Sequence, residues 1–159
     1  MELIDSSKLN QKCSDINIKS ENPKSHLSFF EKLVEHAIEW KGVGLAAPQV
    51  GIFRKEHIWK DKTGTWNFSI NPAYYPDGKT AVYVVEGCLS LSGQFVVPRY
   101  KKVRAVFWTI SEEENKFTKR TLTLRGDDAI TFQHETDHVF GVLISDRGVP
   151  YEEWKKTMG

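Results

Sequence analysis

Two histidines four residues apart form the most informative pattern in the chain. Residues 133–138 read Gln-His-Glu-Thr-Asp-His, so that His134 and His138 flank Glu135 and two further residues. On a helix, positions i and i+4 lie on one face, about one turn or ~6 Å of rise apart. Imidazoles so placed can bind one metal ion, and the intervening glutamate can exchange protons with a nearby water. A helix with two surface histidines is the alternative that this pattern alone leaves open.

A catalytic metal site needs a third protein ligand and an open position for water or substrate. Cys88 is the strongest candidate, because it follows an expected strand and sits beside a glycine, where the backbone can turn. It could instead be a small buried residue, as many free cysteines are. Cys13 lies in a polar segment and is a weaker candidate, while Asp137 points off the ligand face. No histidine follows His138, so the predicted ligand set combines Cys88 with the two motif histidines.

The elements that must position these residues can be read from the spacing of apolar residues. A first helix is expected from about Ser25 or Ser28, with a capping box between Ser28 and Glu31 and an end at Gly42. A second helix is expected from about Asp127 to Phe140, and it carries the histidine motif. The apolar face of the first helix consists of Leu27, Phe30, Leu33, Val34, Ala37 and Ile38.

Between the two helices the chain reads as a series of strands, and a last helical turn is expected at 151–156. Because strands and helices are segregated along the sequence, the fold class is α+β rather than a doubly wound sheet. Asn71-Pro72 and Pro76-Asp77-Gly78 are turn signals. The expected strands are His57–Trp59, Trp66–Ile70, Ala81–Glu86, Phe95–Val97, Val103–Ile110 and Phe117–Leu124.

Length and composition are those of a single globular domain. The chain has 159 residues, 40% of them hydrophobic, and 22 basic residues nearly balance 21 acidic ones. This balance predicts no surface for nucleic acid, and the apolar runs are too short for a membrane span. No signal peptide is recognisable, so we expect a cytoplasmic protein whose two cysteines are reduced.

Three segments together resemble the peptide deformylase family over roughly residues 27–146. They are Gly42-Val43-Gly44-Leu45-Ala46-Ala47-Pro48-Gln49, Glu86-Gly87-Cys88-Leu89-Ser90 and Gln133-His134-Glu135-Thr136-Asp137-His138. Their joint order and spacing are far more specific than any one segment. The resemblance implies a single deformylase-like domain over residues 1–159, in which antiparallel sheets pack around a central metal-binding helix.

The resemblance also implies an activity, namely hydrolysis of the N-formyl group from the formyl-methionine terminus of nascent polypeptides, with release of formate. Cys88 and the two motif histidines would hold one divalent ion, typically iron(II), although zinc, nickel or cobalt fit the same ligands. Glu135 would be the base that takes a proton from the attacking water and passes it to the departing amine. The side chain of Gln49 and the backbone N–H of Leu89 match the family's donors to the oxyanion. If the family resemblance is left aside, Gln49 could be an ordinary surface glutamine.

Substrate binding is implied for a further group of residues. The backbones of Val43, Gly44 and Gly87 match positions that pair with an extended peptide, and an apolar pocket near Val43 and Ile130 would take the methionine side chain. Glu86 and Arg99 would form a supporting ion pair, or else would be two unrelated strand-edge charges.

The match to the family is imperfect in three places. Ser92 stands where many deformylases carry proline, and Asp127, Asp128 and Thr131 make the metal helix more polar beside the methionine pocket than is usual. The tail is also short, which resembles deformylases encoded by some viruses and organelle-related lineages. We therefore expect a monomer with weak or absent ribosome docking through the tail, located in the cytoplasm, in host cytosol or in an organelle.

Two other functions are compatible with parts of this pattern. A zinc endopeptidase would use the same helix, but it requires a third His or Glu ligand downstream and gives Cys88 no role. A catalytically silent peptide-binding module on the deformylase scaffold would not need Glu135 or Gln49. Both residues are present, which favours an enzyme.

Overall fold

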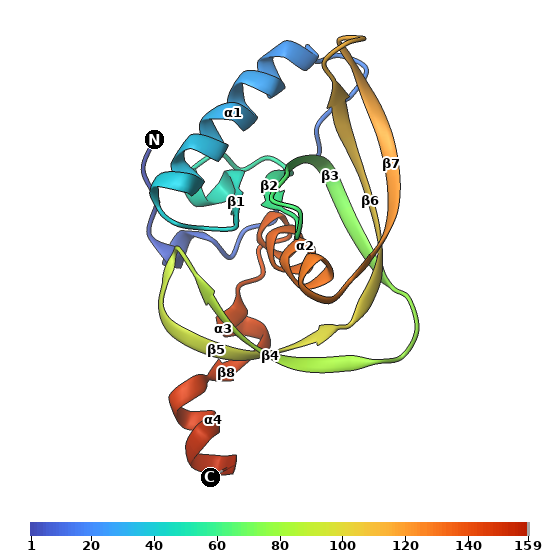
Figure 1. Ribbon diagram of the computed structural model, residues 1–159. Coiled ribbons are helices and arrows are strands. Elements are labelled where there is room, and N and C mark those ends of the chain that lie inside the picture. Colours follow the sequence, from blue (N-terminus) through green and yellow to red (C-terminus); the bar gives the residue numbers. More distant parts are fainter. Residues whose placement is uncertain (159) are drawn as a thin grey trace.

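The protein consists of two antiparallel sheets arranged around a central helix, α2 (Figure 1). The computed structural model describes residues 1–158. The larger sheet has the strand order β1-β2-β3-β6-β7, with β7 at its outer edge, and the smaller sheet has the order β4-β5-β8. The elements are η1 (Ser6–Lys8), α1 (Pro23–Glu39), β1 (Gly44–Ala46), η2 (Ala47–Val50), β2 (Glu56–Lys60), β3 (Trp66–Pro76), β4 (Ala81–Cys88), β5 (Leu91–Tyr100), β6 (Lys102–Ser111), β7 (Lys116–Arg125), α2 (Gly126–Val139), α3 (Ile144–Arg147), β8 (Val149–Pro150) and α4 (Tyr151–Met158).

The α+β class and the central helix are confirmed. Helix α2 begins and ends within one residue of the predicted bounds, and two acidic residues occupy its first turn, near the positive end of the helix. Its side chain Phe132 is fully buried and packs edge-on against Trp59 of β2, with ring centroids 5.7 Å apart. Phe107 of β6 contacts the same ring. This aromatic cluster fixes α2 against the larger sheet and so fixes the helix face that carries the histidines.

Helix α1 begins earlier than predicted. Asn22 caps it by accepting a hydrogen bond from the backbone N–H of Lys24 at 3.0 Å, and Pro23 occupies the first turn. The expected start at Ser25 or Ser28, with its capping box, is therefore wrong. The Asn-Pro pair was interpreted as a turn, but proline is also well suited to the first helical position.

The end of α1 also differs from the prediction. Lys41, with φ of 59°, adopts the left-handed conformation that was expected of Gly42. Phe30 and Leu33 on the apolar face are fully buried beneath the larger sheet's strands, as expected, whereas Ile38 is 60% exposed. The buried face is narrower than the apolar pattern suggests.

All six predicted strands are present, and each is longer than predicted. The turn expected at Asn71-Pro72 is wrong, because β3 continues to Pro76 through a bulge in which Asn71 has φ of 50°. Strand β1 was not predicted as a strand, and α4 is longer than the single turn expected. Within the described residues, no helix is long and apolar enough to cross a membrane.

Candidate metal centre

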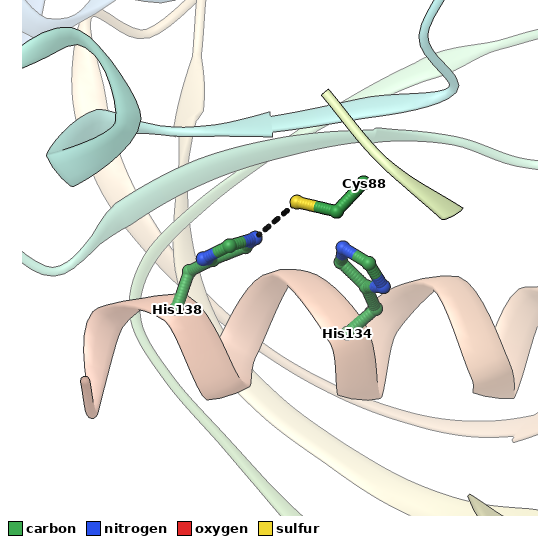
Figure 2. Close-up of side chains that lie close together, drawn as sticks. All are labelled: Cys88, His134 and His138. Carbon is green, nitrogen blue, oxygen red and sulfur yellow. Dashed lines mark hydrogen bonds between the residues drawn. The ribbon is translucent and has the colours of Figure 1, made fainter. Parts of the chain in front are cut away.

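His134 and His138 project from the same face of α2, one turn apart (Figure 2). Their ring centroids are 5.2 Å apart. His138 is 2% exposed, and burial together with the neighbouring charge of His134 lowers its pKa well below the usual value. A neutral imidazole is the form that binds metal ions, so His138 is held in the state that a metal ligand requires.

Cys88 is the last residue of β4 and reaches the histidines from the opposite side (Figure 2). The register between β4 and β5 shifts between Glu86 and Cys88, so Cys88 follows an irregularity at the end of the strand. The Cys88 sulfur lies 3.4 Å from Nε2 of His138. The ligand atoms of Cys88, His134 and His138 all lie within 4.8 Å of one another.

These separations fit a single ion. Ligands about 2.0–2.3 Å from a tetrahedral metal are separated from each other by roughly 3.5 Å, so small adjustments bring the three atoms into place. Burial disfavours the charged form of His134, but its hydrogen bonds to Cys88 and Glu86 outweigh burial and raise the pKa of His134 to about 10. The site therefore favours positive charge at this position, and a divalent cation would satisfy the same groups.

Glu86 and Arg99 form the predicted ion pair, and both are buried. Arg99 donates from Nε and Nη2 to the two carboxylate oxygens of Glu86, at 2.8 and 2.9 Å. Oxygen Oε1 of Glu86 also lies 2.8 Å from Nδ1 of His134. Burial opposes ionisation of Glu86, but its hydrogen bonds with Arg99 and His134 hold its pKa below the usual value. The pair thus fixes the His134 ring, leaving Nε2 to face Cys88.

Glu135 lies on the cavity side of α2 and is 4% exposed. Its Oε1 atom has no hydrogen-bond partner among the described residues. Burial raises the pKa of Glu135 to about 7, close to the value at which a carboxylate can both accept and return a proton. An ideal Cβ at Gly44 would lie 2.3 Å from Oε2 of Glu135, so the glycine makes room for this carboxylate.

Gln49 is buried in η2 and is held at both ends of its amide. Its Oε1 accepts a hydrogen bond from the backbone N–H of Ala46 at 2.9 Å, which fixes which end of the amide is the donor. The Nε2 atom donates to Oγ of Ser90 at 3.0 Å and lies 3.7 Å from the sulfur of Cys88. The donor end of Gln49 is therefore directed at the cluster of expected ligands.

A cavity of about 460 Å³ lies beside this cluster. It is lined by every residue predicted to bind substrate, together with residues that the sequence did not single out. The predicted residues are Val43, Gly44, Gly87 and Ile130, with Leu89 and Gln49, and the additional ones include Lys41, Val84 and Val85. Val84 and Val85 directly precede the Glu86-Gly87-Cys88 segment in β4, and this proximity in sequence was the signal that could have revealed the two valines.

The polar residues expected beside the methionine pocket do not all reach it. Thr131 lines the cavity, as expected. Asp127 is exposed, Asp128 is partly buried, and neither lines the cavity. Asp128 instead accepts a hydrogen bond from the backbone N–H of Lys62 at 2.9 Å. For these two residues the expected polarity of the pocket is wrong, because both lie in the first turn of α2, away from the cavity.

Cys13 does not belong to the group of three candidate ligands. It is buried against Ala46 and Val139, and burial raises its pKa to about 11. Both cysteines are free thiols. A thiol with a raised pKa is a poor ligand, in agreement with the weaker candidacy of Cys13. Asp137 points off the ligand face, as expected.

Comparison with known proteins gives one consistent result. Residues 2–154 match the sequence model of the polypeptide deformylase family. The chain is 32% identical over 123 residues to peptide deformylase of Fusobacterium nucleatum, covering 77% of this chain and 68% of the relative. It is 37% identical over 121 residues to peptide deformylase of Thermotoga neapolitana, and this match covers 76% of this chain and 70% of the relative.

A solved structure agrees with these relatives. The crystal structure of peptide deformylase from Thermus thermophilus has a TM-score of 0.78 and 31% identity, covering 99% of this chain and 89% of that one. Together with the match along nearly the whole chain, these comparisons show that the chain belongs to the peptide deformylase family.

Proposed function

We propose that this protein hydrolyses the N-formyl group of the formyl-methionine terminus of nascent polypeptides and releases formate. Membership of the peptide deformylase family supports this activity. The observation that carries it is the convergence of Cys88, His134 and His138 beside a cavity that also contains Glu135 and Gln49. A bound ion, a proton carrier and a fixed amide donor are together what amide hydrolysis requires.

Cys88, His134 and His138 would hold one divalent cation. When bound, such an ion would polarise the formyl oxygen and make a water molecule more acidic. We propose iron(II) as the native metal, with zinc, nickel and cobalt able to occupy the same ligands. The convergence of the three ligand atoms within 4.8 Å of one another supports this ligand set.

Glu135 would carry the proton. It would accept one from the attacking water and return it to the nitrogen of the departing amine. Three properties support this role: the carboxylate is buried, one of its oxygens has no partner among the described residues, and burial raises its pKa to about 7. A base with a pKa near the operating pH transfers protons efficiently in both directions.

Gln49 and Leu89 would stabilise the negative charge that develops on the formyl oxygen. The amide of Gln49 is held by Ala46 and Ser90, so that its N–H groups point into the cavity without further rearrangement. The backbone N–H of Leu89 would supply a second donor from the turn that follows Cys88. Donors that are already oriented lose little free energy in reorganisation when charge appears.

The peptide would bind as an extended strand between β1 and β4. Val43, Gly44 and Gly87 line the cavity at the edges of the two sheets, where backbone groups are available for pairing. Ile130 would contact the methionine side chain. Main-chain pairing tolerates different downstream sequences, as a nascent-chain enzyme requires.

Several broader properties belong to the same proposal. Residues 1–159 would form one catalytic domain that acts as a cytoplasmic monomer without a nucleic-acid partner. The tail would contribute little to ribosome docking: the described side chains of α4 are not buried, and its two acidic residues balance Lys155 and Lys156.

Formate release from formyl-Met-Ala-Ser, measured on protein prepared without oxygen, tests the proposed function. A zinc endopeptidase would instead cleave internal bonds of unformylated peptides, and a silent binding module would bind the peptide without releasing formate. We expect Glu135→Ala to keep its metal and lose turnover.

Cys88→Ala tests the ligand set, and Cys13→Ala is its matched control. Cys88→Ala should lose the metal, whereas removal of the buried thiol of Cys13 should leave metal content unchanged. A full equivalent of ion in Cys88→Ala would overturn the proposed ligands.

A further inference from the structure

A series of polar contacts with a buried centre connects the short helix α3 to His134, and the proposed function does not use the outer half of this series. Asp137 is 4% exposed and is the centre of these contacts. It accepts hydrogen bonds from Tyr74 of β3 at 2.7 Å, from Arg99 of β5 at 2.7 Å and from Arg147 of α3 at 2.6 and 3.0 Å. Three elements distant in sequence thus meet at one carboxylate on the metal-binding helix.

The inner half of this series of contacts leads from Asp137 to the candidate metal centre. Arg99 donates from Nη1 to Asp137 and from its other two nitrogens to Glu86. Glu86 in turn lies 2.8 Å from Nδ1 of His134. A single guanidinium therefore bridges the carboxylate that orients a ligand and the carboxylate that contacts α3.

Arg147 adds a second guanidinium to the two buried carboxylates that Arg99 contacts. Arg99 is 1% exposed, and the carboxylates of Glu86 and Asp137 are 7% and 6% exposed. Two buried carboxylates that shared one guanidinium would each be incompletely paired, which is costly in a low-dielectric environment. Because Arg147 pairs with Asp137, the two-nitrogen contact of Arg99 remains with Glu86.

We infer that Arg147 and Tyr74 are positioning residues for the metal ligand His134, acting through Asp137, Arg99 and Glu86. The inference rests on the proposed function. Tyr74 donates to Asp137 and accepts from Nη2 of Arg147 at 3.2 Å, so it holds both groups in place. Without Arg147, Arg99 shifts toward Asp137 and loosens its contact with Glu86, and the His134 ring loses its fixed orientation.

Zinc affinity, measured by competition with a chelator, tests this inference without depending on turnover. Arg147→Met should weaken zinc binding by about three- to tenfold, less than the roughly 10–100-fold effect of removing a direct partner of a ligand. Arg147→Lys should recover part of the loss, because it keeps the charge but not the two-nitrogen geometry. Tyr74→Phe removes a hydrogen bond without changing any charge and should have a smaller effect in the same direction.

Arg54→Met is the matched control. The side chains of Arg54 and Arg147 are both 39% exposed and both pair with a carboxylate, but Arg54 pairs with Glu21, outside the cluster around Asp137. Arg54→Met should alter the free energy of unfolding and leave zinc affinity unchanged.

A second measurement separates positioning from a purely structural role. In the zinc-loaded protein, NMR should show faster solvent exchange of the Nδ1 proton of His134 in Arg147→Met than in the wild type. If Arg147→Met lowered only the free energy of unfolding, and zinc affinity and proton exchange matched the wild type, the inference would be wrong. Failure of the wild-type protein to bind zinc would overturn the proposed function, whereas wild-type zinc affinity in Arg147→Met would overturn only the positioning role. The two failures are therefore distinguishable.

Discussion

Replacing Gly44 by alanine should displace the side chain of Glu135 and reduce turnover without removing the metal. An ideal Cβ at Gly44 would lie 2.3, 2.6 and 2.8 Å from Oε2, Cδ and Cγ of Glu135, and contacts shorter than 3.0 Å require a shift. Gly44 does not have a positive φ, so alanine introduces no backbone strain of its own. Alanine also keeps the N–H and C=O groups that would pair with a peptide.

The size of the effect follows from these distances. Ordinary contacts begin at 3.4 Å, so the carboxylate must retreat by about 1 Å, a displacement that can cost ~10²-fold in rate. We therefore expect kcat/KM for formyl-Met-Ala-Ser to fall about 100-fold, equivalent to ~2.7 kcal/mol. Overpacking of this kind should also lower the free energy of unfolding by about 1–3 kcal/mol.

A double-mutant cycle identifies the cause. In a Glu135→Ala background the obstructing atoms are absent, so Gly44→Ala should no longer destabilise the protein. In that background Gly44→Ala should leave the free energy of unfolding unchanged or raise it by about 0.4–1 kcal/mol, the effect of a Gly→Ala substitution at a position where alanine causes no strain. Metal content and urea unfolding would be measured for all four proteins. Equal destabilisation in both backgrounds would refute the steric argument, as would loss of metal in Gly44→Ala.

Three further predictions concern stability and the tail. The hydrogen bond with Glu56 raises the pKa of His26, so the stabilisation from the charged ring is complete below about pH 6.5 and is lost as the pH rises through the folded-state pKa. The free energies of unfolding of wild type and His26→Gln, from urea titrations, should therefore differ at pH 6 and converge at high pH, and a gap independent of pH would contradict this. Gly148→Ala should lower the free energy of unfolding by about 2–3 kcal/mol, because its Cβ would lie 2.2 Å from the backbone oxygen of Val96, which cannot move aside as a side chain can. Deletion of residues 149–159 should leave any cosedimentation with ribosomes unchanged, and loss of cosedimentation on deletion would show that the tail contributes to docking.

The three candidate ligands could be singled out from the sequence because their signals are local. The spacing of His134 and His138 needs only helical periodicity, and Cys88 was selected by its place after a strand and by the lack of other ligand types downstream. Both arguments depend on neighbouring residues. The distance from Cys88 to the helix is a property of the packed sheets, and only the structure gives it.

The partners of Asp137 could not be predicted, because they arrive from distant positions. Tyr74 and Arg147 belong to β3 and α3, and no periodicity in the sequence relates either residue to the motif helix. Their meeting depends on how the two sheets close around α2. The sequence indicated only that Asp137 faces away from the ligands.

The wrong local predictions have local physical causes. Gly44–Ala46 lacks the β-branched and aromatic residues typical of strands, and it is extended because it pairs with β2. Asn71 precedes proline and resembles a turn, but its side chain bonds both the N–H and the C=O of Ile16 at 2.8 Å. These hydrogen bonds hold the segment around Ile16 against Asn71, and they stabilise a bulge inside β3 instead of a turn that reverses the chain.

The outer strand β7 has a consequence for solubility. Its ten residues leave one row of backbone groups unpaired at the edge of the larger sheet, and such an edge can recruit a second molecule. Four cations, Lys116, Lys119, Arg120 and Arg125, are exposed along it. A second copy that aligned with this edge would bring like charges together, so the strand resists self-association. The opposite edge of the larger sheet, β1, is only three residues long and borders the cavity, so backbone pairing with another chain at that edge is confined to a short segment beside the candidate metal centre.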